Sequence, residues 1–273
     1  MKAAKTYADA RANAGRLVIC PTPIGNLGDM PARAIEALRS ADVVCAEDTR
    51  VTGKLLAAFG VEKRLERLDE AMIGAKTEGI IERVMAGEVI VYCSDAGMPG
   101  VSDPGLRLVA AAREAGATVE VLPGPTAAAT AYVASGSSNP CFYFGGFFPR
   151  KAGEQRSLLE TLKPLDAALV FYESPNRIVA ALAAVAEILP LRRVTVCREL
   201  TKLHEEVACG TAAELRDFFA QRAEDGGIKG EIVLVIDGAS AEEELADQAD
   251  SALAAEARAA ELVAEGLRTK EIA

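Results

Sequence analysis

The 273-residue sequence has no tryptophan, a single histidine and few aromatic residues, which make up 5% of the chain. Its six cysteines form no CxxC pair and mostly lie in apolar runs, so we expect buried, reduced thiols. With one histidine besides, a metal site is not expected. No run stays apolar for the ~20 residues that a membrane span requires, and the N-terminus lacks the apolar stretch of a secretory signal. These absences favour a location in the reducing cytoplasm.

Two glycine-rich motifs of nucleotide-binding proteins, GxGxxG and GxxxxGK[ST], are also missing. The net charge of −10 argues against a surface that grips nucleic acid everywhere, although it leaves room for a local basic patch. What the chain does have is apolar residues, which make up half of it, enough to build a core without metals or disulfides.

Short apolar runs alternate with segments of helical spacing. The expected strands span residues 16–20, 42–46, 89–93, 118–122, 142–144, 167–172, 193–197 and 232–236. The expected helices span residues 31–40, 76–86, 126–135, 154–162, 177–189 and 211–224, with a further one ending near residue 115. This alternation predicts an α/β fold with mainly parallel sheets.

The pattern breaks near residue 124, which indicates two domains. We expect an N-terminal α/β domain over residues 16–124 and a C-terminal α/β domain over residues 125–238. A flexible extension over residues 1–15 precedes them, and an acidic helical tail over residues 239–273 follows.

Glycine, proline and acidic residues collect in the loops that follow the expected strands, where open α/β sheets bind their ligands. Glycine lets backbone groups approach a ligand closely. The longest such loop, Ser94–Gly105, holds Asp95 and a second aspartate but no lysine or arginine. It is a poor cradle for a triphosphate and suits a compact ligand with positive charge, such as an amino group or a sulfonium.

Five segments carry a resemblance to a known family. They are PTPIGNL at 21–27, AEDTR at 46–50, SDAGMP at 94–99, PGPTA at 123–127 and CRELTK at 197–202. In this order and spacing they resemble the tetrapyrrole-methylase superfamily, and more closely its ribosomal branch, over about residues 16–238. The ribosomal branch often carries a His/Asn/Glu-rich stretch after the second helix, of which residues 67–71 keep only the acids. The tail resembles an incomplete copy of the helical module with which the family tends to finish.

The resemblance implies a class III methyltransferase: a homodimer of two-domain chains that bind S-adenosylmethionine in the cleft between the domains. Matching the motifs position by position implies a set of donor contacts made mainly by the backbone. They are Pro23, Ala96, Gly97, Met98, Val101, Thr126, Ala127, Tyr172, Glu173 and Leu200, to which the loop composition adds Asp95.

The ribosomal branch further implies 2′-O-methylation of a cytidine ribose in the decoding region of 16S ribosomal RNA, in the small ribosomal subunit. Three alternatives stay open. A tetrapyrrole C-methyltransferase would use the same donor site, a diphthamide-type enzyme would methylate protein, and a nucleotide-binding regulator would bind the donor without transferring the methyl group. The AEDTR and CRELTK segments favour the ribosomal branch.

A ribose hydroxyl is a weak nucleophile, so a nearby base or hydrogen-bond acceptor should help its attack. Glu199 and Asp48 follow expected strands and are the candidate catalytic residues. Either of them fits equally well as a helix cap or as a partner of the neighbouring arginine. The single histidine, His204, lies in a polar stretch and is better explained as a solvated or RNA-facing residue.

Candidate RNA contacts are basic residues near these motifs. Arg150 and Lys151 follow two phenylalanines, a combination that suits an RNA backbone and stacked bases. Arg50 and Lys202 are candidate phosphate contacts. A solvated loop explains the Arg150–Lys151 pair equally well.

Overall fold

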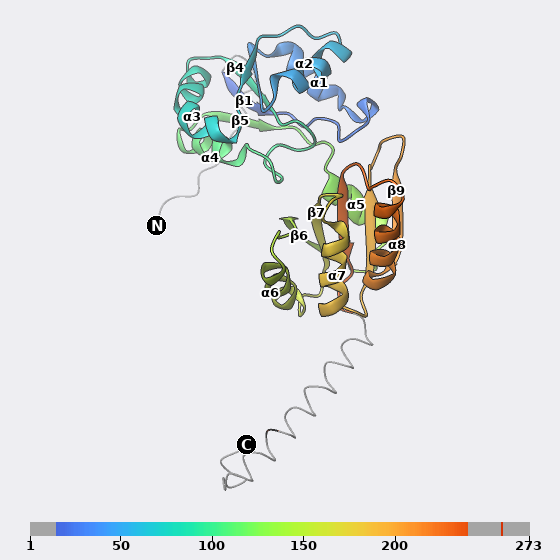
Figure 1. Ribbon diagram of the computed structural model, residues 1–273. Coiled ribbons are helices and arrows are strands. Elements are labelled where there is room, and N and C mark those ends of the chain that lie inside the picture. The colour runs from blue at the N-terminus through green and yellow to red at the C-terminus, as the bar shows by residue number, and fades with distance from the viewer. Residues whose placement is uncertain (1–14, 240–257, 259–273) are drawn as a thin grey trace, which may run out of the picture. The chain divides into compact units, whose positions relative to one another are not determined.

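The computed structural model describes residues 15–239 and Arg258 (Figure 1). The chain divides into two compact units, and the boundary falls between Thr130 and Ala131. The segment Glu199–Glu205 belongs with the first unit, although it lies far along the chain. The expected N-terminal extension and helical tail fall almost wholly outside the described residues.

The first unit is built on a five-stranded sheet with the order β3-β2-β4-β1-β5, in which every pairing is parallel. Its strands are β1 (Arg16–Ile19), β2 (Val43–Ala46), β3 (Leu65–Arg67), β4 (Val89–Cys93) and β5 (Thr118–Val121). Its helices are the 3₁₀ turn η1 (Leu27–Asp29), α1 (Ala32–Ser40), α2 (Thr49–Ala58), α3 (Glu70–Met85) and α4 (Leu106–Glu114), and α5 (Ala127–Ser135) crosses the unit boundary.

Both faces of this sheet are covered by helices. Successive residues of β1 point to opposite faces: Leu17 packs in a cluster with α3 and α4, and Val18 packs in a cluster with α1 and α2. All residues of β2 are buried, as a central parallel strand requires. The sheet is therefore fixed on both sides, and its edge positions the loops that follow the strands.

The second unit has a five-stranded sheet with the order β6-β7-β10-β8-β9. Its strands are β6 (Phe142–Phe147), β7 (Ala168–Glu173), β8 (Arg193–Arg198), β9 (Glu206–Thr211) and β10 (Ile232–Ile236), and its helices are α6 (Ala152–Leu162), α7 (Ile178–Ile188) and α8 (Ala212–Glu224). The β6–β7 pairing is parallel and the others are antiparallel, so this sheet is mixed. The predicted α/β class is confirmed, and the expectation of mainly parallel sheets holds for the first sheet, whereas the second sheet has one parallel and three antiparallel pairings.

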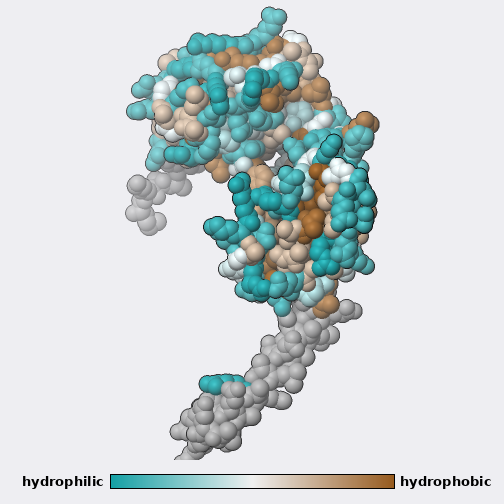
Figure 2. Space-filling model, in the orientation of Figure 1, coloured by the Kyte–Doolittle hydropathy of each residue, from teal (hydrophilic) through white to brown (hydrophobic). Residues whose placement is uncertain are grey.

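One face of the second sheet packs against α6, α7 and α8 through a single apolar cluster, which includes Leu159, Val185 and Phe219. The start of α8 is fixed by a capping box: the Thr211 hydroxyl accepts from the Glu214 backbone N–H, and the Glu214 carboxylate accepts from that of Thr211. Figure 2 shows a largely hydrophilic surface on which hydrophobic residues appear in patches.

Two further expectations concern cysteines and membrane spans. All six cysteines are free thiols, and four are buried as expected, but Cys141 and Cys209 are exposed because they lie at or next to the edge strands β6 and β9. No helix among the described residues is both long and apolar enough to cross a membrane.

Candidate active site

Because all strands of the first sheet are parallel, the loops after their carboxyl ends gather at one edge, which we call the carboxyl edge. The loop after β1 and the loop after β4 are joined there by two backbone hydrogen bonds between Thr22 and Gly97, of 2.9 and 3.1 Å. The Thr22 hydroxyl also donates to the Ser94 carbonyl oxygen at 3.3 Å. Two of the predicted motifs therefore form one connected structure.

Gly97 lies where three of the predicted motifs meet. Its φ of +81° is a conformation that residues with side chains rarely adopt. A Cβ atom at this position would lie 3.3 Å from Ile24 Cγ2 and 3.6 Å from the Pro125 carbonyl oxygen. Glycine at 97 therefore lets the loops after β1, β4 and β5 converge.

The loop after β4 has positive φ values at several separate positions. Besides Gly97, positive φ values occur at Gly100, at Ser102 with +64°, and at Gly105. Ala96 is exposed and Met98 is half-buried. Ala96 therefore lies at the surface, whereas Met98 packs against the apolar cluster under α3 and α4.

Carboxylates connect the loops after β2 and β4. The Asp48 backbone N–H donates to Asp95 Oδ1 at 3.0 Å, and the Asp95 backbone N–H donates to Glu47 Oε2 at 3.4 Å. Partial burial raises the pKa of the Glu47 carboxyl, and the charge of Asp95 adds to this shift. Burial, together with the charges of Glu47 and Asp95, raises the pKa of Asp103 to about 6. The carboxyl edge therefore carries a negative potential that a cation would relieve.

Asp48 has a structural role. It is the N-cap of α2, where its carboxylate accepts from the Arg50 backbone N–H at 2.8 Å and from the Arg50 guanidinium. The hydrogen bonds from Arg50 hold the pKa of Asp48 well below its usual range. These contacts account for Asp48 without a catalytic role.

Glu199 occupies a different setting. It has a φ of +53°, directly after β8, in the segment that belongs with the first unit. Its Oε1 lies 2.8 Å from Lys202 Nζ, and its carbonyl oxygen accepts from the Lys202 backbone N–H at 3.0 Å. Thr201 also has a positive φ, of +67°. Such backbone conformations persist where the surrounding structure holds them, which is common at functional sites.

The segment Glu199–Glu205 lies against the loop after β1. A Cβ atom on Gly25 would lie 2.4 Å from Lys202 Cγ and 3.1 Å from Thr201 Oγ1. The missing side chain at position 25 thus leaves the space that the Lys202 side chain fills. Leu200 is buried and His204 is exposed.

In the second unit, the predicted contacts Tyr172 and Glu173 end strand β7. The Tyr172 ring packs edge-on against Phe144 and Phe147, with centroids 4.9 and 5.6 Å apart. Glu173 Oε1 accepts from the Ser174 backbone N–H at 2.6 Å and from Arg177 Nε at 2.7 Å. Glu173 Oε2 is buried and has no hydrogen-bond partner in the described chain.

The predicted RNA contacts are exposed to different degrees and have different partners. Arg150 is exposed, and Lys151 Nζ lies 2.9 Å from Glu154 Oε1 on the first turn of α6. The Arg50 side chain is 86% exposed although it pairs with Asp48. Sequence reasoning did not assign Glu47 or Asp103. Both stand in segments that it singled out, but the burial that shifts their pKa values has no signature in the sequence.

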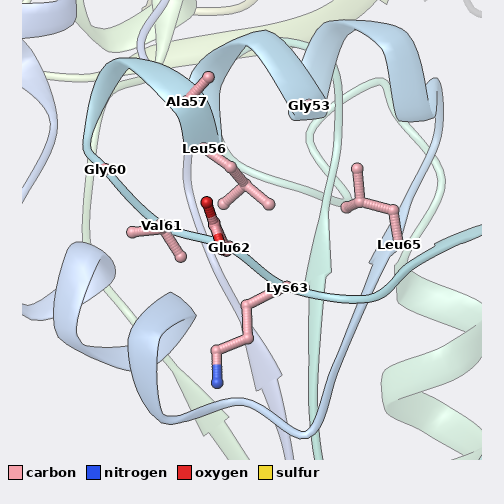
Figure 3. Close-up of a pocket in the computed structure, with 8 residues that line it drawn as sticks. All are labelled: Gly53, Leu56, Ala57, Gly60, Val61, Glu62, Lys63 and Leu65. Atoms are coloured by element: carbon pink, nitrogen blue, oxygen red, sulfur yellow. The ribbon is translucent and has the colours of Figure 1, made fainter.

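A hollow of about 650 Å³ lies elsewhere in the first unit (Figure 3). It is lined by the end of α2, the turn before β3 and the start of β3, and so lies where strands begin rather than where they end. Lys63 points away from α2 and donates to the Ala41 carbonyl oxygen at 2.7 Å. The hollow contains none of the predicted site residues.

Residues 16–216 match the family described as Tetrapyrrole (Corrin/Porphyrin) Methylases, so the chain belongs to that family, and the predicted membership is confirmed. Its fold is that of diphthine synthase (TM-score 0.62, 17% identity, 81% of this chain and 90% of that one). It is also that of uroporphyrin-III-C-methyltransferase from Thermus thermophilus (TM-score 0.56, 23% identity, 82% of this chain and 94% of that one).

Sequence similarity to curated relatives is stronger. The chain is 42% identical to Ribosomal RNA small subunit methyltransferase I of Halalkalibacterium halodurans, over 87% of this chain and 81% of that protein. It is 41% identical to the Bacillus subtilis protein of the same name, over 86% of this chain and 79% of that protein. It is 39% identical to the protein of the same name from Escherichia coli O157:H7, over 88% of this chain and 84% of that protein.

Proposed function

We propose that this protein transfers a methyl group from S-adenosylmethionine to the 2′-oxygen of a cytidine ribose in the decoding region of 16S ribosomal RNA. The observation that carries the proposal is about 40% identity, over most of the chain, to relatives named for methylation of small-subunit ribosomal RNA. The motifs behind the resemblance lie mainly in the loops of the carboxyl edge, where this fold class binds ligands.

The chemistry of the carboxyl edge suits this donor. S-adenosylmethionine supplies, when bound, an electrophilic methyl group on a positively charged sulfur. Glu47, Asp95 and Asp103 provide the opposite charge, and the loop after β4 adds no cation of its own. The proposed contacts from the first unit are Pro23, Asp95, Ala96, Gly97, Met98, Val101, Thr126, Ala127 and Leu200. From the second unit they are Tyr172 and Glu173, whose unpartnered Oε2 is available as an acceptor.

Glu199 is the proposed acceptor for the ribose hydroxyl proton. Its ion pair with Lys202 fixes the carboxylate in one orientation, and the packing of Lys202 across Gly25 fixes the lysine in turn. A general base of this kind contributes about 10²–10⁴-fold to the rate. Asp48 is the second candidate, with a smaller expected contribution because Arg50 occupies its oxygens.

RNA contacts are proposed at Arg50, Arg150, Lys151 and Lys202, which supply positive charge on a chain of net charge −10. Localised rather than general positive charge favours selective recognition of an assembled RNA. We also propose that the protein acts in the cytoplasm as a homodimer, which the family resemblance supports and light scattering would test.

The test is incubation with labelled donor and small ribosomal subunits that lack the modification, followed by mapping of the label. The expected product carries the label on the ribose 2′-oxygen of one cytidine. Label on a base carbon, or transfer to a tetrapyrrole instead of RNA, would contradict the proposal. Donor binding with no methyl transfer to any acceptor would point to a regulator.

A further inference from the structure

A second hollow, of about 820 Å³, lies in the second unit between the end of α8 and the end of β8. We call it the α8 hollow. It is lined by Arg198, Phe218, Gln221, Arg222, Asp225, Gly226, Gly227 and Lys229. None of these residues belongs to the proposed donor site or to the proposed RNA contacts.

Two guanidinium groups of the hollow are fixed by one acid. Arg198 Nε donates to Glu206 Oε2 at 2.7 Å, and Arg222 Nη1 donates to both oxygens of Glu206 at 2.6 and 2.7 Å. Although partial burial raises the pKa of Glu206, these hydrogen bonds bring it below its ordinary value, so the acid stays ionised. Arg198 Nη1 also donates to the Lys229 carbonyl oxygen at 3.2 Å.

The charge of the hollow is positive on balance. Arg198, Arg222 and Lys229 provide three cations, against the carboxylates of Glu206 and Asp225. Gln221 donates to both oxygens of Asp225 at 3.3 Å, so this acid is tied to the rim by a side chain of α8. On a protein of net charge −10, a local excess of cations marks a place where an anion is favoured.

An aromatic ring lies beside these cations. Phe218 is 49% exposed, and the Arg222 guanidinium carbon lies 5.8 Å from the centre of its ring. The ring of the buried Phe219 packs edge-on against it. The two ring centroids are 5.1 Å apart, and the angle between the ring planes is 85°. A half-exposed ring held next to a fixed guanidinium provides a flat surface on which a planar group can stack.

Backbone is exposed on the remaining side. A Cβ atom on Gly226 or Gly227 would meet nothing within 4 Å, so open space faces both residues. A ligand can therefore reach the backbone of this turn without meeting side chains. The hollow thus combines an aromatic face, positive charge and accessible backbone.

Two residues that form this ion-pair group, Arg198 and Glu206, flank the segment Glu199–Glu205 in the sequence. Arg198 ends β8, Glu206 begins β9, and the two residues pair directly in the antiparallel ladder. The ion pair between them closes the base of the loop Glu199–Glu205.

We propose that the α8 hollow binds an unpaired nucleotide of the RNA substrate. The base stacks on Phe218 beside Arg222, and the phosphate contacts Lys229. Neutral or basic protein surfaces fit this combination less well, because they provide no anion for the excess cations, and an acidic surface provides anions but no planar base to stack on Phe218. The proposal rests on the proposed function, since it assumes an RNA substrate.

The test measures affinity for a short, labelled single-stranded RNA of the decoding-region sequence by fluorescence anisotropy, without donor. Phe218→Ala should weaken binding about fivefold to tenfold, and Phe218→Leu, which keeps the apolar volume, should weaken it similarly. Phe218→Tyr, which keeps a stacking ring, should stay within about twofold. Lys229→Gln should weaken binding and lower the slope of log affinity against log salt by about 0.7.

Arg216→Gln is the matched control, because Arg216 lies on the same helix, pairs with Asp217 and does not line the hollow. It removes one positive charge and should leave the affinity within about twofold. Unchanged melting temperatures would show that the variants fold.

Unchanged RNA affinity in Phe218→Leu and Lys229→Gln would overturn the proposal, as would the absence of measurable binding by the wild type. A shift in oligomeric state on light scattering, in place of a loss of RNA affinity, would show that the surface is a subunit contact instead. Because no methyl transfer is measured, failure here leaves the proposed function to be judged by the label-mapping experiment alone.

Discussion

The two edges of the first sheet differ in what they present to a ligand. The edge where strands begin has the clear hollow of Figure 3, lined mostly by small and aliphatic residues. The carboxyl edge has glycines at positive φ, loops joined by backbone hydrogen bonds, and carboxylates with raised pKa values. The comparison teaches that backbone at positive φ and acids with raised pKa values occur together at the edge that carries the motifs, whereas the hollow at the other edge contains none of the predicted site residues.

The largest expected effect separates the two candidate catalytic acids, Glu199 after β8 and Asp48 at the carboxyl edge. Glu199→Gln should lower the rate of single-turnover methyl transfer by about 10²–10⁴-fold, because the variant keeps its shape but loses its proton acceptor. Asp48→Asn should lower it much less, because Asp48 acts mainly as the cap of α2. If both variants react within a few-fold of wild type, neither carboxylate is the base, and positioning of the substrates accounts for the rate.

The next effect concerns the glycine that makes room for Lys202. Gly25→Ala places a Cβ atom 2.4 Å from Lys202 Cγ, so the Lys202 side chain, which pairs with Glu199, must shift. We expect a fall in kcat of about tenfold to a hundredfold, since a displacement of this size misaligns the reacting groups. Gly79→Ala, in the interior of α3 with nothing within 4 Å of its Cβ position, is the control and should leave kcat unchanged. Equal rates for the two variants would contradict the role given to Gly25.

A smaller effect follows from the acids that surround the donor loop. The pKa of Asp103 is raised to about 6, so this group loses its charge as the pH falls through that value. A bound cation is then attracted less, and donor affinity should fall by about threefold to tenfold between about pH 7 and about pH 5. Asp103→Asn should flatten this dependence in calorimetric titrations, although Glu47, whose pKa is also raised, and Asp95 remain nearby. A pH dependence that survives in Asp103→Asn would assign it to Glu47 instead.

The smallest effect belongs to the opposite edge. Lys63→Met removes the hydrogen bond to the Ala41 carbonyl oxygen and should lower the free energy of unfolding by about 1 kcal/mol. Methyl transfer should be unaffected, because this lysine lies at the beginnings of strands. Denaturant unfolding and the single-turnover assay measure the two quantities separately. A loss of activity without a loss of stability would contradict the assignment of methyl transfer to the carboxyl edge alone.

The first sheet could be predicted from the sequence in large part, because its central strands are continuous apolar runs followed by conspicuous loops. Besides the three-residue turn η1, three elements were missed. The strand β3 has only three residues, β9 is an edge strand with alternate residues exposed, and α2 contains Gly53 and two threonines that weaken its helical pattern. The antiparallel pairing of β10 with β7 and β8 depends on tertiary packing, which no local pattern records.

The candidate site was predictable to a similar degree. Loop motifs led to Gly97, which follows the parallel strand β4, and to Glu199, which follows the antiparallel strand β8, because glycine and acidic residues at strand ends have a physical reason to be there. The space that Gly25 leaves for Lys202 depends on a contact between segments far apart in the chain, and it became visible only in the structure.

The most direct test of the account compares donor binding after each edge is filled. Ala96 is an exposed residue of the carboxyl edge, and Ala57 is an exposed residue of the hollow at the other edge. The account predicts that calorimetry detects S-adenosylmethionine binding by the wild type and by Ala57→Trp with similar affinity. It predicts that Ala96→Trp loses at least about tenfold in affinity at an unchanged melting temperature. Full donor affinity in Ala96→Trp, or its loss in Ala57→Trp, would contradict the assignment of the donor to the carboxyl edge.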